Sequence, residues 1–105
     1  MSENVKFVVF VPENDADKVR QAIGEAGAGK IGNYDFCSFS TKGIGRYKPT
    51  EGAVPAIGAV GKFESVAEER IEVVCPRKIL EDVINAVKKV HPYEEVAFDV
   101  YPLDN

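Results

Sequence analysis

The sequence has no tryptophan, a single histidine and only two cysteines among its 105 residues. Two cysteines are too few for a disulfide scaffold, so we expect Cys37 and Cys75 to be reduced thiols in a cytoplasmic protein. Hydrophobic runs are also short: the longest, Phe7 to Pro12, is far below the ~20 residues of a membrane span. We therefore expect no membrane span, and no charged-then-apolar leader is visible.

Positive charge is in short supply. Thirteen Lys and Arg against 17 Asp and Glu give a net charge of -4, which does not provide the cationic field that nucleic-acid binding requires. We expect neither nucleic acid nor membrane among the partners. With 45% hydrophobic residues, the chain has enough apolar side chains for a core, and its length predicts one domain over residues 1–105.

A strand followed by a helix occurs twice. Residues 5–11 are rich in β-branched and aromatic side chains and stop at Pro12, and residues 70–75 run in the same way into Pro76. After each proline the apolar residues take the three-and-four spacing of a helix with one buried face. The prolines are 64 residues apart, and the apolar positions of the two helices align at that offset. The chain is therefore built from two similar halves.

Each half continues into a further extended segment, at residues 34–41 and 95–101. The resulting order predicts an α+β fold, the ferredoxin-like βαββαβ sandwich, with two helices on one face of an antiparallel-containing four-stranded sheet. Asn14 and Asp17 are expected to form a weak capping box at the first helix. Cys37 and Cys75 fall in predicted strands, where small buried hydrophobic residues are common.

A long central loop is expected between the halves. Residues 42–61 contain five glycines and two prolines, and a connection of that length is usually functional or mobile. Residues 58–63 are expected to add a short strand. Arg46 and Lys48 lie among the glycines, where they suit a phosphate or carboxylate. The alternative is a flexible hairpin tip with solvated charges.

Strand alternation divides the apolar residues between two faces of the sheet. One set is expected under the helices: Phe7, Val9, Val11, Ile71, Val73, Cys75, Val96, Phe98 and Val100. A second set is expected on the open face: Val8, Phe10, Val74, Ala97 and Tyr101, beside Lys6, Glu72 and Asp99. Burial of four such side chains is worth ~1.5–3 kcal/mol each, which favours self-association over a few tolerated surface hydrophobic residues.

Several separated strings carry a family resemblance. They are residues 37–43 (CSFSTKG), 48–52 (KPTEG), 70–72 (RIE), 91–97 (HPYEEVA) and 101–103 (YPL). Together they resemble the insertion domain of the dinuclear-metal-centre hexameric proteins of the NGG-interacting-factor-like family. That insertion domain is similar to CutA and PII proteins, which assemble as trimers through their sheets. The resemblance therefore implies a CutA/PII-like fold, here standing alone, and a homotrimer.

The resemblance does not extend to the family's metal centre. In the multidomain proteins, His and acidic residues of flanking domains hold the paired metals, and one histidine cannot build such a centre within one subunit. His91 and Glu95, with Tyr93 and Glu94 beside them, are the candidate ligands for a divalent ion completed by a neighbouring subunit. The alternative for His91 is an ordinary solvent-contacting residue at a helix end.

The PII-like resemblance also implies that the long loop touches partners. The candidate ligand or partner residues are Arg46, Tyr47, Lys48, Glu51, Tyr93 and Glu94. No catalytic residue is indicated, so the sequence predicts a non-catalytic oligomeric sensor or scaffold that binds a small ligand, ion or partner protein through its loop and inter-subunit clefts. The alternative is a divalent-metal-binding protein or a metal-dependent enzyme with sites completed between subunits.

Overall fold

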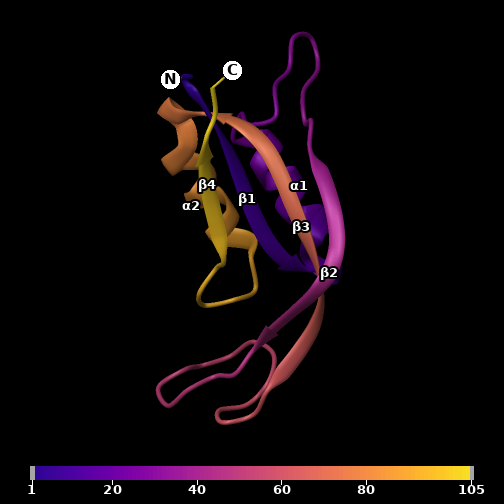
Figure 1. The fold of residues 1–105 in the computed structure, drawn as a ribbon, viewed down its shortest axis with the longest axis vertical. Helices are drawn as coiled ribbons and strands as arrows, with labels where there is room; N and C mark the ends of the chain where they lie inside the picture. Colours follow the sequence, from indigo (N-terminus) through magenta and orange to yellow (C-terminus); the bar gives the residue numbers. More distant parts are fainter. Residues whose placement is uncertain (1, 105) are drawn as a thin grey trace.

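A computed structural model describes residues 2–104, which fold into a four-stranded sheet and two α-helices (Figure 1). The elements are β1 (Asn4–Pro12), α1 (Ala16–Glu25), β2 (Phe39–Tyr47), β3 (Glu64–Pro76), α2 (Leu80–Val90) and β4 (Phe98–Pro102). Short 3-10 turns, Glu13–Asp15 and Arg77–Ile79, precede the two helices. Both turns follow a proline, whose fixed φ suits the entry to a helical segment.

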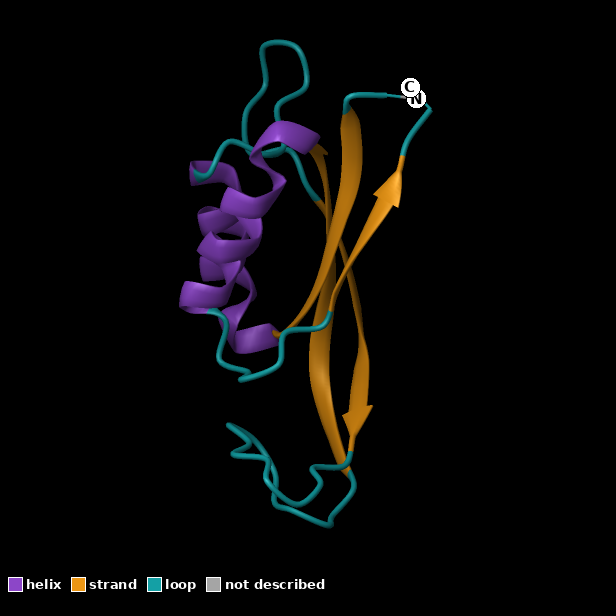
Figure 2. Ribbon diagram, turned by 90° about the vertical axis from the view of Figure 1, so that its left-hand side faces the viewer, coloured by secondary structure: helices purple, strands orange, loops and turns teal. Residues whose placement is uncertain are grey.

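The strands lie in the order β2-β3-β1-β4, and every neighbouring pair is antiparallel. Both helices pack on the same face of the sheet, so the molecule has two layers (Figure 2). This confirms the ferredoxin-like βαββαβ sandwich. The order also interleaves the two halves of the chain, because β1 from the first half lies between β3 and β4 from the second.

The core lies between the sheet and the helices, and the side-chain alternation predicted for that face is confirmed. Phe7 is fully buried, and its ring lies 5.7 Å from that of Phe98. Val19 of α1 and Val83 of α2 are also fully buried. The nine residues predicted under the helices all belong to this core or pack against it: Phe7, Val9, Val11, Ile71, Val73, Cys75, Val96, Phe98 and Val100.

The opposite face is partly covered by its own charged side chains. Val8 of β1 lies on this face, where no helix packs, and it is nevertheless 0% exposed. Lys6 Nζ lies 3.5 Å from Glu72 Oε1, and Arg70 Nε lies 3.3 Å from Glu72 Oε2. Since Glu72 is directly opposite Val8 in the β1–β3 pair, this charged group lies over the middle of the sheet.

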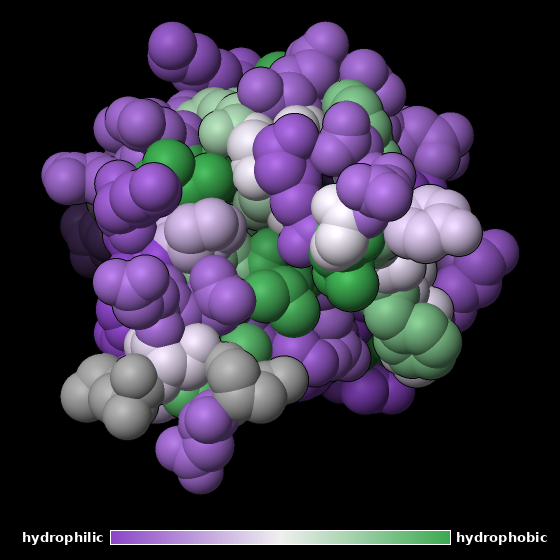
Figure 3. Space-filling view, turned by 90° about the horizontal axis from the view of Figure 1, so that it is seen from above, coloured by the Kyte–Doolittle hydropathy of each residue, from purple (hydrophilic) through white to green (hydrophobic). Residues whose placement is uncertain are grey.

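Aromatic side chains still reach solvent on this open face. Phe10, Val74 and Tyr101 lie on it as predicted, and the Arg70 guanidinium lies over the Phe10 and Tyr101 rings. Tyr101 keeps 41% of its surface exposed, and Phe39 at the start of β2 keeps 66%. From the end of the molecule that carries the termini, hydrophobic side chains form a small group among hydrophilic ones (Figure 3).

The second strand differs from its prediction. Residues 34–38 lie outside it, and the strand runs from Phe39 through Gly43 and Gly45 to Tyr47. Pairing with β3 accounts for the difference: Gly43 is opposite Glu68 and Gly45 is opposite Val66, so ladder hydrogen bonds outweigh the poor strand propensity of glycine. The central loop is therefore shorter than expected, at residues 48–63.

Three local predictions are wrong. Residues 58–63 form bends and turns instead of a strand, because their glycines at 58 and 61 take positive φ. The capping box is not formed: Asp15 is the N-cap of α1, and its side chain makes no capping hydrogen bond. The 3-10 turn displaces Asn14 from the capping position. Cys37 is not in a strand but lies half-buried in the preceding loop.

Cys75 is buried, and burial raises the pKa of its thiol. Both cysteines are free. Between residues 2 and 104, no helix has the length and apolar character required to cross a membrane.

Candidate ligand-binding pocket

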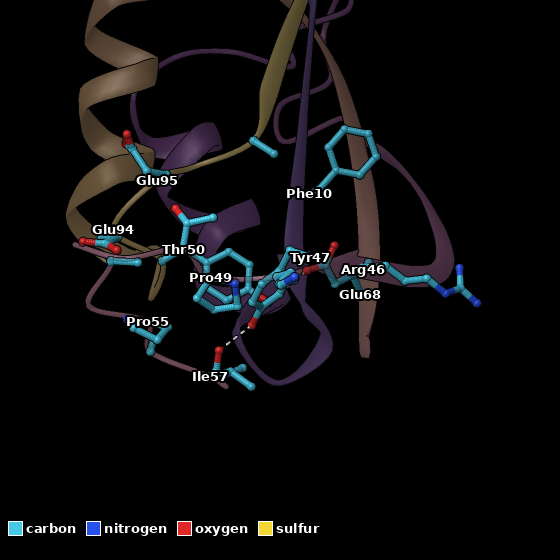
Figure 4. Close-up of a pocket in the computed structure, with 16 residues that line it drawn as sticks. Phe10, Arg46, Tyr47, Pro49, Thr50, Pro55, Ile57, Glu68, Glu94 and Glu95 are labelled. Carbon is cyan, nitrogen blue, oxygen red and sulfur yellow. Dashed lines mark hydrogen bonds between the residues drawn. The ribbon is translucent and has the colours of Figure 1, made fainter. Parts of the chain in front are cut away.

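The sheet has one end that lies away from the termini (Figure 1). A pocket of 440 Å³ opens at that end (Figure 4). The β2–β3 hairpin forms this end because it continues to the pair Tyr47–Glu64, whereas β1 pairs with β3 only as far as Glu68. The loop after β2 lines one side of the pocket, and residues between 93 and 97, just before β4, line another. The volume is within the range of small-molecule sites, ~300–1,000 Å³.

Glu68 is the buried polar residue of this wall. It is 8% exposed, and the Tyr93 hydroxyl donates a hydrogen bond to its Oε2 at 2.9 Å. No cation within the described chain forms an ion pair with Glu68, and its Oε1 makes no hydrogen bond there. A methyl group on Gly45 would overlap the carboxylate, so the glycine of the neighbouring strand leaves the space that Glu68 occupies.

Tyr93 acts as a fixed hydrogen-bond donor. Burial raises the pKa of its hydroxyl well above the ordinary value, and the hydrogen bond to Glu68 raises it further. Burial disfavours the phenolate, and a bond donated to a carboxylate stabilises the neutral phenol. Tyr93 therefore keeps its proton at neutral pH and holds one oxygen of Glu68 in place.

Two hydrogen bonds hold the loop over the pocket. The Tyr47 hydroxyl donates to the Ile57 carbonyl oxygen at 2.7 Å (Figure 4), and the Val54 backbone N–H donates to Glu94 Oε1 at 2.8 Å. The rings of Tyr47 and Tyr93 meet edge to face, with centroids 5.7 Å apart. The loop is thus attached to the sheet by Tyr47 and to the segment before β4 by Glu94.

The two cations of the predicted anion site do not face the cavity. Arg46 points away from the pocket in Figure 4. Lys48 Nζ lies 5.1 Å from the centre of the Phe63 ring, a cation–π distance. Both residues border the pocket, but their charges are directed elsewhere, so the geometry gives no support to a phosphate or carboxylate held between them.

His91 is buried, so the expected solvent contact is wrong. Its Nε2 lies 2.7 Å from the Phe10 carbonyl oxygen, and the Tyr93 backbone N–H donates to Nδ1 at 3.1 Å. Since Nδ1 accepts, the neutral ring carries its proton on Nε2 and donates it to Phe10. The ring joins the end of α2 to β1, and neither nitrogen is left for a metal.

The metal prediction for His91 and Glu95 gains no support from this arrangement. Glu95 borders the pocket as an exposed side chain. Over the described residues, no group of three or more His, Cys, Asp and Glu side chains is placed to hold a metal ion. A site of this kind would need donors from a second subunit.

The structure brings most of the predicted ligand residues to one place. Those that line the pocket are Arg46, Tyr47, Lys48, Tyr93 and Glu94. Glu51 is exposed in the loop and is not part of the wall.

Sequence reasoning missed Glu68, the most buried charged residue of the pocket. It stands in the string Glu68-Glu69-Arg70, which resembles a solvated charge run. A signal was available: alternation from Glu72 through Arg70 places Glu68 on the open face once the strand is extended toward residue 64.

Comparison with known proteins gives relatives but no family-model match. The chain is 52% identical over 99 residues to the GTP cyclohydrolase 1 type 2 homolog of Bacillus subtilis, covering 94% of this chain and 26% of that protein. It is 49% identical over 98 residues to the homolog of the same name from Mycobacterium tuberculosis, covering 93% and 26%. The chain thus spans about a quarter of the length of these curated relatives.

Two solved structures are similar to this chain, one in sequence and fold and the other in fold alone. A Bacillus cereus protein related to NIF3 is 51% identical, with a TM-score of 0.85 over 97% of this chain and 26% of that one. The CutA divalent cation tolerance protein of Archaeoglobus fulgidus is 15% identical, with a TM-score of 0.71 over 97% and 85%. The CutA similarity shows the fold, and the chain corresponds to one small domain of the larger NIF3-related proteins.

Proposed function

We propose that residues 1–105 form a single non-catalytic binding domain, similar to the insertion domain of the NIF3-related proteins, which acts in the cytoplasm as a homotrimeric sensor or scaffold. Its ligand is a small molecule held in the pocket beside the loop at residues 48–63. The observation that carries this proposal is the pocket itself, where a buried carboxylate, two tyrosines and a tethered loop meet. The two free cysteines suit a reducing compartment.

The chemistry of the pocket favours binding over catalysis. Tyr93 retains its proton and is fixed on Glu68, and His91 uses both ring nitrogens in structural hydrogen bonds. A nucleophile with an adjacent general base would be needed for acyl or phosphoryl transfer. The name GTP cyclohydrolase 1 type 2 homolog belongs to relatives about four times longer, so the activity in that name is attributed to those proteins.

Assembly through the open face is the second part of the proposal. Phe39 and Tyr101 offer exposed aromatic surface there, and covering such surface is worth roughly 25 cal/mol per Å². Phe10 and Glu68 belong both to this face and to the pocket wall. Association of the sheets would therefore place the pocket at a cleft between subunits.

Native mass spectrometry tests the assembly and its contents together. We expect a mass of three chains, with a bound small molecule released on denaturation. The double variant Phe39→Asp with Tyr101→Asp is expected to give single chains, whereas Tyr34→Asp, which adds one such charge at an exposed tyrosine away from the sheet, keeps the trimer. Monomeric wild-type protein at micromolar concentration would overturn the proposal that the protein is a trimer.

A divalent-metal protein, or a metal-dependent enzyme completed between subunits, is the second candidate. It is supported by the neighbouring carboxylates Glu94 and Glu95 at the pocket and by the cation-tolerance name of the CutA structures. Calorimetric titration of the assembled protein with zinc or copper is the test. Stoichiometric heats that disappear in Glu94→Gln with Glu95→Gln would favour this candidate, and absent heats would reject it.

A further inference from the structure

The buried charge of Glu68 has no counter-charge in the described chain. Only 8% of the residue is exposed, its Oε2 accepts the hydrogen bond from Tyr93, and its Oε1 accepts no hydrogen bond from the described residues. Removing a carboxylate from water without pairing it is costly. Glu68 borders both the 440 Å³ pocket and the adjoining groove on the open face. A group that enters this cavity meets an unpaired anion.

The remainder of the wall suits a flat, apolar body. Tyr47 and Tyr93 meet edge to face beside Glu68, and Phe10 lies on the same side of the sheet. Two apolar residues of the loop also line the pocket: Pro49, which is buried, and Ile57. Aromatic rings attract cations through their electron-rich faces, so these rings and the carboxylate favour the same kind of ligand.

The protein's own cations leave this charge uncompensated. Arg46 points away from the cavity, and Lys48 is directed toward Phe63. Glu94 and Glu95 add negative charge at the rim. The balance at the pocket is therefore acidic, which is the opposite of the anion site expected from the loop sequence.

We propose that the pocket binds a small organic cation, a protonated amine carried on a flat apolar body. The ammonium group donates to Glu68 Oε1, and the apolar body lies against Tyr47 and Tyr93. This inference rests on the proposed ligand-binding function and specifies its ligand class. Gly45 is part of the same binding site, because a methyl group at this position would displace the Glu68 carboxylate.

The test is an NMR titration of the native protein, following the amide signals of Glu68 and Tyr93. The probes are benzylammonium, neutral benzyl alcohol and benzoate, which share one ring and differ in charge. We expect benzylammonium to bind about tenfold more tightly than benzyl alcohol, because a hydrogen bond between two charged groups is stronger than one from a neutral hydroxyl. Benzoate is expected to bind most weakly.

Glu68→Gln is the decisive variant, because glutamine keeps the shape and can still accept from Tyr93. It should lose the preference for benzylammonium and leave benzyl alcohol affinity unchanged. Glu81→Gln, with the same charge change at an exposed position on α2, is the control and should behave as wild type. Gly45→Ala should weaken benzylammonium binding by moving the carboxylate.

The outcomes separate this inference from the function on which it rests. Equal binding of benzylammonium and benzyl alcohol would overturn the proposal that the ligand is a cation. The pocket would remain a ligand site. No binding of any probe would overturn the ligand-binding function as well. If Glu68→Gln instead changes the number of chains in the native mass spectrum, a basic residue of a second copy neutralises Glu68, and the inference is wrong.

Discussion

Tyr93 donates its hydroxyl hydrogen to Oε2 of Glu68 at 2.9 Å, which joins the segment before β4 to the middle of β3. The bond fixes a buried carboxylate that has no ion-pair partner in the described chain. Removing the hydroxyl would leave both oxygens of Glu68 without a donor. This relationship allows the pocket to be tested through stability as well as through binding.

Tyr93→Phe is therefore expected to lower the free energy of unfolding by about 1–3 kcal/mol, the usual cost of an unsatisfied buried polar group. Urea denaturation followed by far-UV circular dichroism measures the effect. Tyr34→Phe is the matched control, because Tyr34 is 73% exposed, and it should change stability little. Equal stability of the two variants would show that water satisfies Glu68 instead.

The raised pKa of Tyr93 predicts a loss of stability in alkaline solution. In the unfolded chain this hydroxyl ionises near its ordinary value of 10.0, whereas burial and Glu68 keep it protonated in the folded protein. Its stabilising contribution is complete below about pH 10 and is lost as the pH rises further. Absorbance titration should show a tyrosine that ionises only well above pH 10.

That late phase should disappear in Tyr93→Phe. Four tyrosines that ionise together near pH 10 while circular dichroism still reports folded protein would contradict the prediction.

Arg20 connects α1 to the sheet, and its loss should destabilise the fold. Its guanidinium bonds to Glu69 of β3, to Asp17 and, at 3.0 Å, to the Ser40 hydroxyl. Arg20→Met is expected to cost about 1–2 kcal/mol, because it leaves the largely buried Glu69 carboxylate without its partner. Thermal unfolding measures the change.

Lys18→Met is the comparison, since Lys18 pairs with Asp15 at the surface and its loss should cost under about 1 kcal/mol. Similar effects of the two variants would mean that the Arg20 cluster is no stronger than an ordinary surface pair. A double-mutant cycle with Glu69→Gln isolates the coupling between Arg20 and Glu69.

Gly24 in α1 should resist the stabilisation that alanine usually gives inside a helix. A Cβ at this position would overlap the Phe36 ring, which the loop between α1 and β2 places against the helix. We expect Gly24→Ala to forfeit the usual gain of roughly 0.5–1 kcal/mol. With Phe36→Ala already present, the same substitution should recover that gain. Equal effects in both backgrounds would show that Phe36 moves aside freely.

The helix-covered face was predictable because its pattern is local. Val9 and Val73 alternate with outward residues inside short strands that end at prolines, and the helical spacing of Val19 and Val83 indicates which face each helix buries. These signals lie within a few residues of the positions that they describe. The two similar halves predicted the ferredoxin-like fold.

The extent of the second strand was not predictable, because its glycines favour loops and only the partner strand stabilises them. Gly43 and Gly45 become strand residues through pairing with β3. Glu68 was missed for the same reason, since the length of the hairpin determines whether it faces the pocket. His91 contacts a carbonyl 81 residues away, a distance beyond any local pattern.

The strand order has a consequence for a chain cut in two. β1 belongs to the first half but pairs on both sides with strands of the second half, and β2 pairs only with β3. Neither half can assemble neighbouring strands by itself. A single proteolytic nick at Gly52 in the exposed loop should therefore leave the two fragments locked together, and separately produced halves should reconstitute only as a pair, in the manner of a split reporter.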